Sequence, residues 1–196
     1  MKKLLISLFL MFLCFGAYSQ SIKRESGSLM FLKSAKVVGV TFTYDNMKVG
    51  KLTEEEYISN SVSRLNKKKT GGGDRWKEAW IGDRSEKYEP KFVESFSKFI
   101  GEKGVSVTTS DYEYEMMVNV DFIEPGFNMG ITAGDAVVNM TCRIINKNDG
   151  SEVAIITVKN AKYSSSIDPT VGGRVQEAFS LAGRALAKFM IKDAKL

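Results

Sequence analysis

The fold is decided by residues 112–123, which read YEYEMMVNVDFI. Because successive side chains of a β-strand point to opposite faces, a strand buried on one face alternates between apolar and polar residues. The side chains expected in the core are Tyr112, Tyr114, Met116, Val118, Val120 and Phe122. The opposite, mostly wet face should carry Glu113, Glu115, Met117, Asn119, Asp121 and Ile123. The run therefore predicts a long strand with one buried face.

The same alternation returns at 135–147, which predicts a second long strand. Its expected inward side chains are Ala136, Val138, Met140, Cys142 and Ile144. Its expected outward side chains are Asn139, Thr141, Arg143 and Lys147. The sequence NDGS at 148–151 is a strong turn signal between two apolar runs, so a hairpin should lead into a last strand at 152–162.

Antiparallel pairing of the two long strands would gather polar side chains on one exposed face. These side chains are Asn119, Asp121, Asn139, Thr141 and Arg143. An attraction across the strands between Asp121 and Arg143 would follow from this pairing. The face is either a solvated surface and nothing more, or a candidate interaction surface in which Asn119, Asp121 and Arg143 take part.

A helix is predicted at 53–67, because Thr53 and Glu56 have the spacing of a capping box. Residues 67–74 read KKKTGGGD and join lysines to glycines, but a phosphate-binding loop has its glycines first and follows a strand. We expect a flexible, solvated surface loop there.

Two further helices and two short strands complete the pattern. A helix at 89–100 has Pro90 in its first turn and a wide apolar stripe. The C-terminal helix should begin between Asp168 and Gly173. Its basic residues, expected to be solvated, are Arg174, Arg184, Lys188 and Lys192. The remaining strands are predicted at 36–44 and 105–109.

This order of elements predicts an α/β fold of the α+β type. The arrangement is a two-layer sandwich, with a mainly antiparallel sheet and helices packed on one of its faces. We expect a single domain at 35–196, preceded by an exposed leader at 20–34.

Residues 1–19 have the three parts of a secretory signal peptide. Lys2 and Lys3 precede an apolar run at 4–15. The small residues at 16–19 have the pattern of a signal-peptidase site and predict cleavage before Gln20. The apolar run is shorter than the roughly 20 residues that span a bilayer, so no transmembrane span is expected after cleavage. The chain is therefore predicted to be exported to the periplasm or outer envelope, or secreted.

Composition restricts the chemistry. The chain has no histidine, which excludes Ser-His-Asp, Cys-His and zinc hydrolase sites. Cys142 is the only cysteine after residue 19 and is expected to be a buried small hydrophobe, so no disulfide forms within the exported chain. We expect no metal, no cofactor and no catalytic residue of a recognisable motif. The small net positive charge argues against nucleic acid as a partner.

The connection at 125–135 is unusual, because three large apolar residues alternate within a glycine-containing loop. These are Phe127, Met129 and Ile131. They either pack against the helices of the domain, or part of the set stays exposed and contacts a protein partner or a membrane surface.

Three features together resemble uncharacterised exported envelope-protein families of Gram-negative bacteria. They are the run FIEPGFNMG at 122–130, the turn at 148–150 and a closing helix that contains Ala182 and Gly183. The resemblance covers roughly 112–192 and implies an exported location and this fold. It transfers no activity and no catalytic residue.

The leading functional hypothesis is a non-catalytic binding or assembly module of the periplasm or outer envelope, with an unknown envelope protein or ligand as its partner. Without histidine, the possibilities left are carboxylate chemistry of the glycosidase or lytic type, a Ser-Lys dyad, or no catalysis. The alternative function is therefore a carboxylate-dependent hydrolase that acts on envelope glycans.

Overall fold

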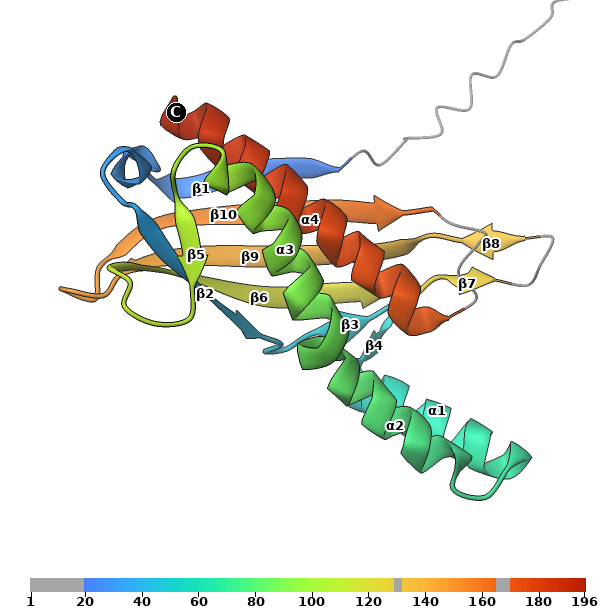
Figure 1. The fold of residues 1–196 in the computed structure, drawn as a ribbon. Helices are drawn as coiled ribbons and strands as arrows, with labels where there is room; N and C mark the ends of the chain where they lie inside the picture. The colour runs from blue at the N-terminus through green and yellow to red at the C-terminus, as the bar shows by residue number, and fades with distance from the viewer. Residues whose placement is uncertain (1–19, 129–131, 165–169) are drawn as a thin grey trace, which may run out of the picture.

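The computed structural model describes residues 20–128, 132–164 and 170–196 (Figure 1). In chain order the elements are β1 (Ser21–Gly27), η1 (Met30–Lys33), β2 (Val37–Thr43), β3 (Lys48–Val49), β4 (Leu52–Thr53), α1 (Glu54–Lys68), α2 (Gly72–Asp83), the π-helical turn η2 (Arg84–Tyr88), α3 (Glu89–Gly101), β5 (Ser106–Thr108), β6 (Tyr114–Glu124), β7 (Phe127–Asn128), β8 (Ala133–Gly134), β9 (Ala136–Asn146), β10 (Glu152–Tyr163) and α4 (Val171–Ala194). The predicted signal peptide lies outside the described residues.

The main sheet has the strand order β1-β10-β9-β6-β2-β5. Its long strands pair antiparallel, whereas β2 runs parallel to both β5 and β6. Helices α3 and α4 lie side by side across one face of this sheet (Figure 1). The architecture is the predicted two-layer α/β sandwich with a mainly antiparallel sheet.

The predicted alternation holds along most of β6 and all of β9. Met116, Val118 and Val120 are fully buried, and so are the five inward side chains predicted for β9. The alternation predicted for the end of β6 is wrong, because the register with β9 shifts between Val120 and Phe122. A β-bulge inserts one extra residue and reverses the faces beyond it, so Ile123 is buried in place of Phe122.

The segment at 20–34 is more ordered than the exposed leader that we expected. Strand β1 pairs antiparallel with β10, although most of its side chains face solvent. Leu29 and Leu32, which follow it, are buried in the core. This pairing satisfies the backbone groups along one side of β10 and makes β1 the edge strand of the sheet.

Helices α1 and α2 form an antiparallel pair, here called the arm, that extends beyond one end of the sheet (Figure 1). The predicted capping box is present, with Thr53 and Glu56 each accepting a hydrogen bond from the backbone of the other. The flexible loop expected at 67–74 is instead a tight turn, and α2 already begins at Gly72. Gly71 has the left-handed backbone of this turn, and a Cβ on Gly73 would lie 2.4 Å from the carbonyl oxygen of Val62.

A polar cluster at the base of the arm links the arm to the sheet. Trp80 donates a 2.6 Å hydrogen bond from Nε1 to Glu54, which is also ion-paired with Arg84. The guanidinium of Arg84 lies 4.1 Å from the ring centre of Tyr44, just beyond β2. Trp76 stacks on Trp80, so both tryptophans pack within the arm.

Helix α4 begins within the predicted window, after Thr170 as N-cap. The prediction that Arg174 is solvated is wrong, because its exposed fraction is 2%. Its guanidinium donates hydrogen bonds of 3.3 Å to the carbonyl oxygens of Pro125 and Gly126, where the chain leaves β6. Within the described residues, no helix combines the length and apolar content needed to cross a bilayer.

Candidate ligand-binding surface

The sheet face opposite α3 and α4 contains a hollow of about 390 Å³ near the ends of β2 and β6. Its lining residues come from β2, β6, β9 and the turn after β2, and they are Thr43, Asp45, Asn46, Met117, Asn119, Asp121, Thr141 and Arg143. We refer to this feature as the open-face hollow. It contains four of the five polar residues that the sequence predicted to share one face.

Asn119 is the structural centre of the hollow. Its Oδ1 accepts hydrogen bonds from the Thr43 hydroxyl at 2.8 Å and from the Asp45 backbone N–H at 2.9 Å. Its Nδ2 donates to the Asp45 carbonyl oxygen at 3.3 Å and to Asp121 Oδ1 at 2.8 Å. An amide side chain offers two donors and two acceptor sites, so these four bonds occupy its whole capacity. Asn119 therefore fixes the geometry of the hollow and leaves ligand contacts to its neighbours.

Asp121 is held between two strands by neutral donors. Oδ1 accepts the bond from Asn119, and Oδ2 accepts a 2.7 Å bond from the hydroxyl of Thr141 on β9. An ionised carboxylate has about four acceptor sites, so each oxygen keeps one for another donor. The carboxylate is oriented on a rigid sheet and still able to accept hydrogen bonds from a ligand.

Arg143 lies at the rim of the hollow. The expected attraction between Arg143 and Asp121 is not formed, because Arg143 stands opposite Met117 in the register and its Nε lies 3.9 Å from Glu152 on β10. This part of the register is regular, and Asp121 lies four residues beyond Met117 along β6, so Asp121 and Arg143 do not stand opposite each other. The side chain of Arg143 is 62% exposed and keeps donors for a ligand.

Asn139 does not contribute to the hollow. Its side-chain oxygen accepts a 2.7 Å hydrogen bond from the backbone N–H of Asn160, where β10 departs from regular pairing. The sequence interpretation missed Thr43, Asp45 and Asn46. Thr43 could have been found from its outward parity in the strand predicted at 36–44, whereas the two turn residues depend on the path of the chain after β2.

Beside the hollow, Glu115 forms a second polar group on the same face. Its carboxylate accepts hydrogen bonds from the Thr41 hydroxyl at 2.9 Å and from the Lys147 ammonium at 3.0 Å. Partial burial acts to raise the pKa of Glu115, but the bonds from Lys147 and Thr41 outweigh it and leave the pKa below its ordinary value.

Cys142 lies on the core side of the sheet and is fully buried. Burial first, and the charge of Asp121 second, raise the pKa of the Cys142 thiol to about 12. The thiol is therefore protonated at neutral pH, as expected for a buried small hydrophobe. Among the described residues, no cluster of three or more cysteine and acidic side chains is placed to hold a metal ion.

Phe127 is the one described member of the apolar set in the connection at 125–135, because Met129 and Ile131 lie outside the described residues. It belongs to the two-stranded ribbon of β7 and β8, and it is 49% exposed. Its ring lies so close to Gly134 that a Cβ there would be 2.4 Å from the ring. Phe127 thus packs partly on the ribbon, and its role as an interaction residue stays a prediction.

No family model matches this chain, and no curated protein matches its sequence. Among solved structures, a variant of the PelC dodecamer from Paraburkholderia phytofirmans is 16% identical with a TM-score of 0.42, and covers 86% of this chain and 95% of its own. A second PelC dodecamer structure from the same organism is 12% identical with a TM-score of 0.40, and covers 84% of this chain and 96% of its own.

A DUF330 protein from Xanthomonas campestris is 16% identical with a TM-score of 0.37, and covers 52% of this chain and 60% of its own. All three solved structures are distant from this chain in both sequence and fold, and they assign it to no family. None of them transfers a ligand or a partner to this chain.

Proposed function

We propose that this protein is an exported, non-catalytic binding module of the cell envelope that holds a neutral, hydroxyl-bearing ligand of the glycan class in the open-face hollow. The observation that carries the proposal is the orientation of Asp121. Its two oxygens are fixed by Asn119 and Thr141 and each can still accept a hydrogen bond. Preorganised acceptors on a rigid sheet lower the ordering cost of binding.

The charges of the hollow favour a neutral ligand over an anion. Its lining has two carboxylates, those of Asp45 and Asp121, and one guanidinium, that of Arg143. An anionic ligand would meet an excess of negative charge, whereas hydroxyl groups can donate to the carboxylates. Met117, which is 38% exposed, offers an apolar contact for the C–H face of a sugar ring. This combination of a few convergent polar groups and an apolar surface is typical of small-molecule sites.

The alternative, a hydrolase of envelope glycans, is favoured by one observation. Two carboxylates, Asp45 and Asp121, line the same hollow, and glycosidases use such a pair. In that mechanism one carboxyl must donate a proton while the other acts as base or nucleophile.

Titration calorimetry with soluble envelope glycan fragments tests the proposal. Asp121→Asn removes an ionised acceptor, whose hydrogen bond is worth about 1.5–3 kcal/mol, so we expect the affinity to fall about 10-fold to 100-fold. Thr141→Val releases one oxygen of Asp121 and should weaken binding in the same direction. The matched control is Thr157→Val, because Thr157 donates to Glu25 on β1 and lies outside the hollow.

Equal affinity in the parent chain, Asp121→Asn and Thr141→Val would contradict the proposal. Analysis of the same fragments for new reducing ends distinguishes the binding hypothesis from the hydrolase hypothesis. Under the binding hypothesis the fragments stay intact, whereas under the hydrolase hypothesis they are cleaved and cleavage is lost in both Asp45→Asn and Asp121→Asn.

A further inference from the structure

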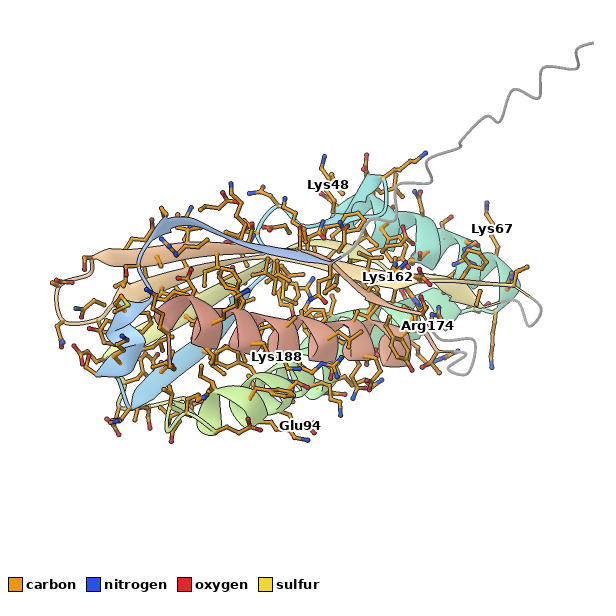
Figure 2. All side chains as sticks on the ribbon, turned by 90° about the horizontal axis from the view of Figure 1, so that it is seen from above. Lys48, Lys67, Glu94, Lys162, Arg174 and Lys188 are labelled. Carbon is orange, nitrogen blue, oxygen red and sulfur yellow. The ribbon has the colours of Figure 1, made fainter. Side chains whose placement is uncertain are left out.

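The distal end of the arm carries a cluster of exposed basic side chains, here called the arm tip. Its members come from the end of α1, the following turn and the first half of α2, and they are Arg64, Lys67, Lys68, Lys69, Arg75 and Lys77. Figure 2 shows Lys67 far out on the arm, well separated from Glu94 and Lys188 on the helices that cover the sheet. The open-face hollow is a different surface.

The arm tip holds the whole positive excess of the exported chain. Residues 64–78 contain six basic and two acidic side chains, Asp74 and Glu78. Residues 20–196 contain 26 basic side chains, which are the 28 of the sequence less Lys2 and Lys3, and all 23 acidic ones. The rest of this chain therefore has 20 basic and 21 acidic residues, which is close to neutral.

Among the described residues, the ion pairs include none of the six basic side chains of the arm tip. Three acidic residues of the arm, Glu54, Glu55 and Glu56, lie instead at its base, in the first turn of α1. Like charges that lie close together on a helix repel one another. Repulsion among these basic side chains therefore lowers the stability of the free arm. An anionic partner would relieve that repulsion.

We propose that the arm tip docks on an anionic lipid bilayer surface. The cluster sits on the convex end of a projecting pair of helices, and long basic side chains on such an end can reach a flat array of headgroups without a shaped groove. Clusters of four to eight basic residues on an amphipathic helix are a recognised signature of binding to anionic lipid.

The aromatic residues of the arm favour lipid over single-stranded nucleic acid. A single strand is bound by a basic groove together with aromatic rings that are free to stack on bases. Trp80 is 4% exposed, Trp76 stacks on it, and Tyr57 packs against both rings. The rings nearest the cluster are therefore engaged in the packing of the arm.

Vesicle binding by the chain from Gln20, which contains every described element, tests the proposal. Both tryptophans of the protein lie in α2, so their fluorescence reports on the arm and can be followed alongside vesicle sedimentation. We expect binding to phosphatidylglycerol vesicles and none to phosphatidylcholine vesicles. Binding should be lost between about 0.1 M and about 1 M salt, because the Debye length falls from about 10 Å to about 3 Å.

The triple variant Lys67→Gln, Lys68→Gln, Lys69→Gln should bind anionic vesicles about a hundredfold more weakly, at about fivefold for each charge removed. A double variant on the other helix, Arg75→Gln with Lys77→Gln, should lose about 25-fold by the same rule. If the triple variant disrupts the end of α1, this double variant still tests whether the arm tip binds vesicles.

The matched control removes three exposed lysines, Lys33→Gln in η1, Lys36→Gln just before β2 and Lys103→Gln between α3 and β5, and should bind nearly as the parent does. These segments lie at the end of the sheet away from the arm (Figure 1). An equal loss in this control would mean that net charge alone attracts the protein to vesicles, which overturns the proposal. Failure of the parent to bind anionic vesicles at low salt also overturns it, as does equally tight binding of single-stranded DNA through the same lysines.

Discussion

Arg174 is the residue whose position departs most from its sequence pattern. It belongs to the first turn of α4, and it is buried where the chain leaves β6. Its guanidinium donates to two backbone carbonyls of the turn at Pro125 and Gly126. A buried carbonyl that loses its donor costs far more than an exposed one, since water cannot replace the bond. Arg174 therefore joins the start of α4 to the end of β6.

Replacing this guanidinium should destabilise the whole domain. We expect Arg174→Met to lower the free energy of unfolding by about 1–3 kcal/mol for each carbonyl left without a donor. Arg184→Met is the matched control, because Arg184 lies exposed on the same helix, and surface substitutions of this kind usually change stability by less than about 0.5 kcal/mol. Urea unfolding measures both, and equal stability of the two variants would refute the role given to Arg174.

At the scale of elements, the crossing of α3 and α4 determines how the helical layer covers the sheet. Gly183 lies at this crossing, and a Cβ there would be 2.4 Å from the carbonyl oxygen of Phe92. Near it, the hydroxyls of Ser95 and Ser180 form a 2.7 Å hydrogen bond between the two helices. Small residues let the backbones approach closely at this point. The larger side chains of the layer pack to either side of it.

A methyl group at this crossing should separate the helices. Because the nearest atom belongs to the backbone, Gly183→Ala is expected to cost about 1–3 kcal/mol of stability. Gly101→Ala is a direct comparison at the end of α3, since nothing lies within 4 Å of its Cβ and alanine favours a helix by about 0.5–1 kcal/mol. Thermal melting distinguishes them, and a Gly183→Ala protein as stable as the parent would show that the helices can part at no cost.

At the scale of the whole molecule, the stability of the domain should depend on pH through Glu115. This carboxylate links β6 to Thr41 on β2 and to Lys147 in the turn after β9. Its pKa in the folded protein is lowered from the ordinary value of 4.5. A group whose pKa is lowered by folding contributes its stability above the unfolded pKa, and loses it as the pH falls through the folded pKa.

We therefore expect Glu115→Gln to be less stable than the parent at neutral pH, with a difference that disappears in acid. Urea unfolding between neutral pH and about pH 3 measures this difference, and Glu102→Gln at the exposed end of α3 is the control. A difference that grows as the pH falls below the ordinary pKa of about 4.5 would contradict the assignment.

The amino-acid sequence by itself determined the two-layer fold, its long strands and the helices α1, α3 and α4. Alternation along β6 and β9, the capping box at Thr53 and the turn after β9 are local patterns. Local patterns can be recognised from residue spacing, because they reflect the geometry of one strand, one helix end or one hairpin. The same parity placed Asn119, Asp121, Thr141 and Arg143 on one face.

Only the tertiary structure decided which of these side chains meet. The hydrogen bond between Thr43 and Asn119 joins residues that are 76 positions apart, and it depends on the parallel pairing of β2 with β6. The bulge at Asp121, the burial of Arg174 and the pairing of β1 at the sheet edge likewise depend on neighbours that are distant in sequence. The periodicity of apolar and polar residues cannot reveal such neighbours, because the environment of a side chain depends on whichever strand, turn or helix packs against it.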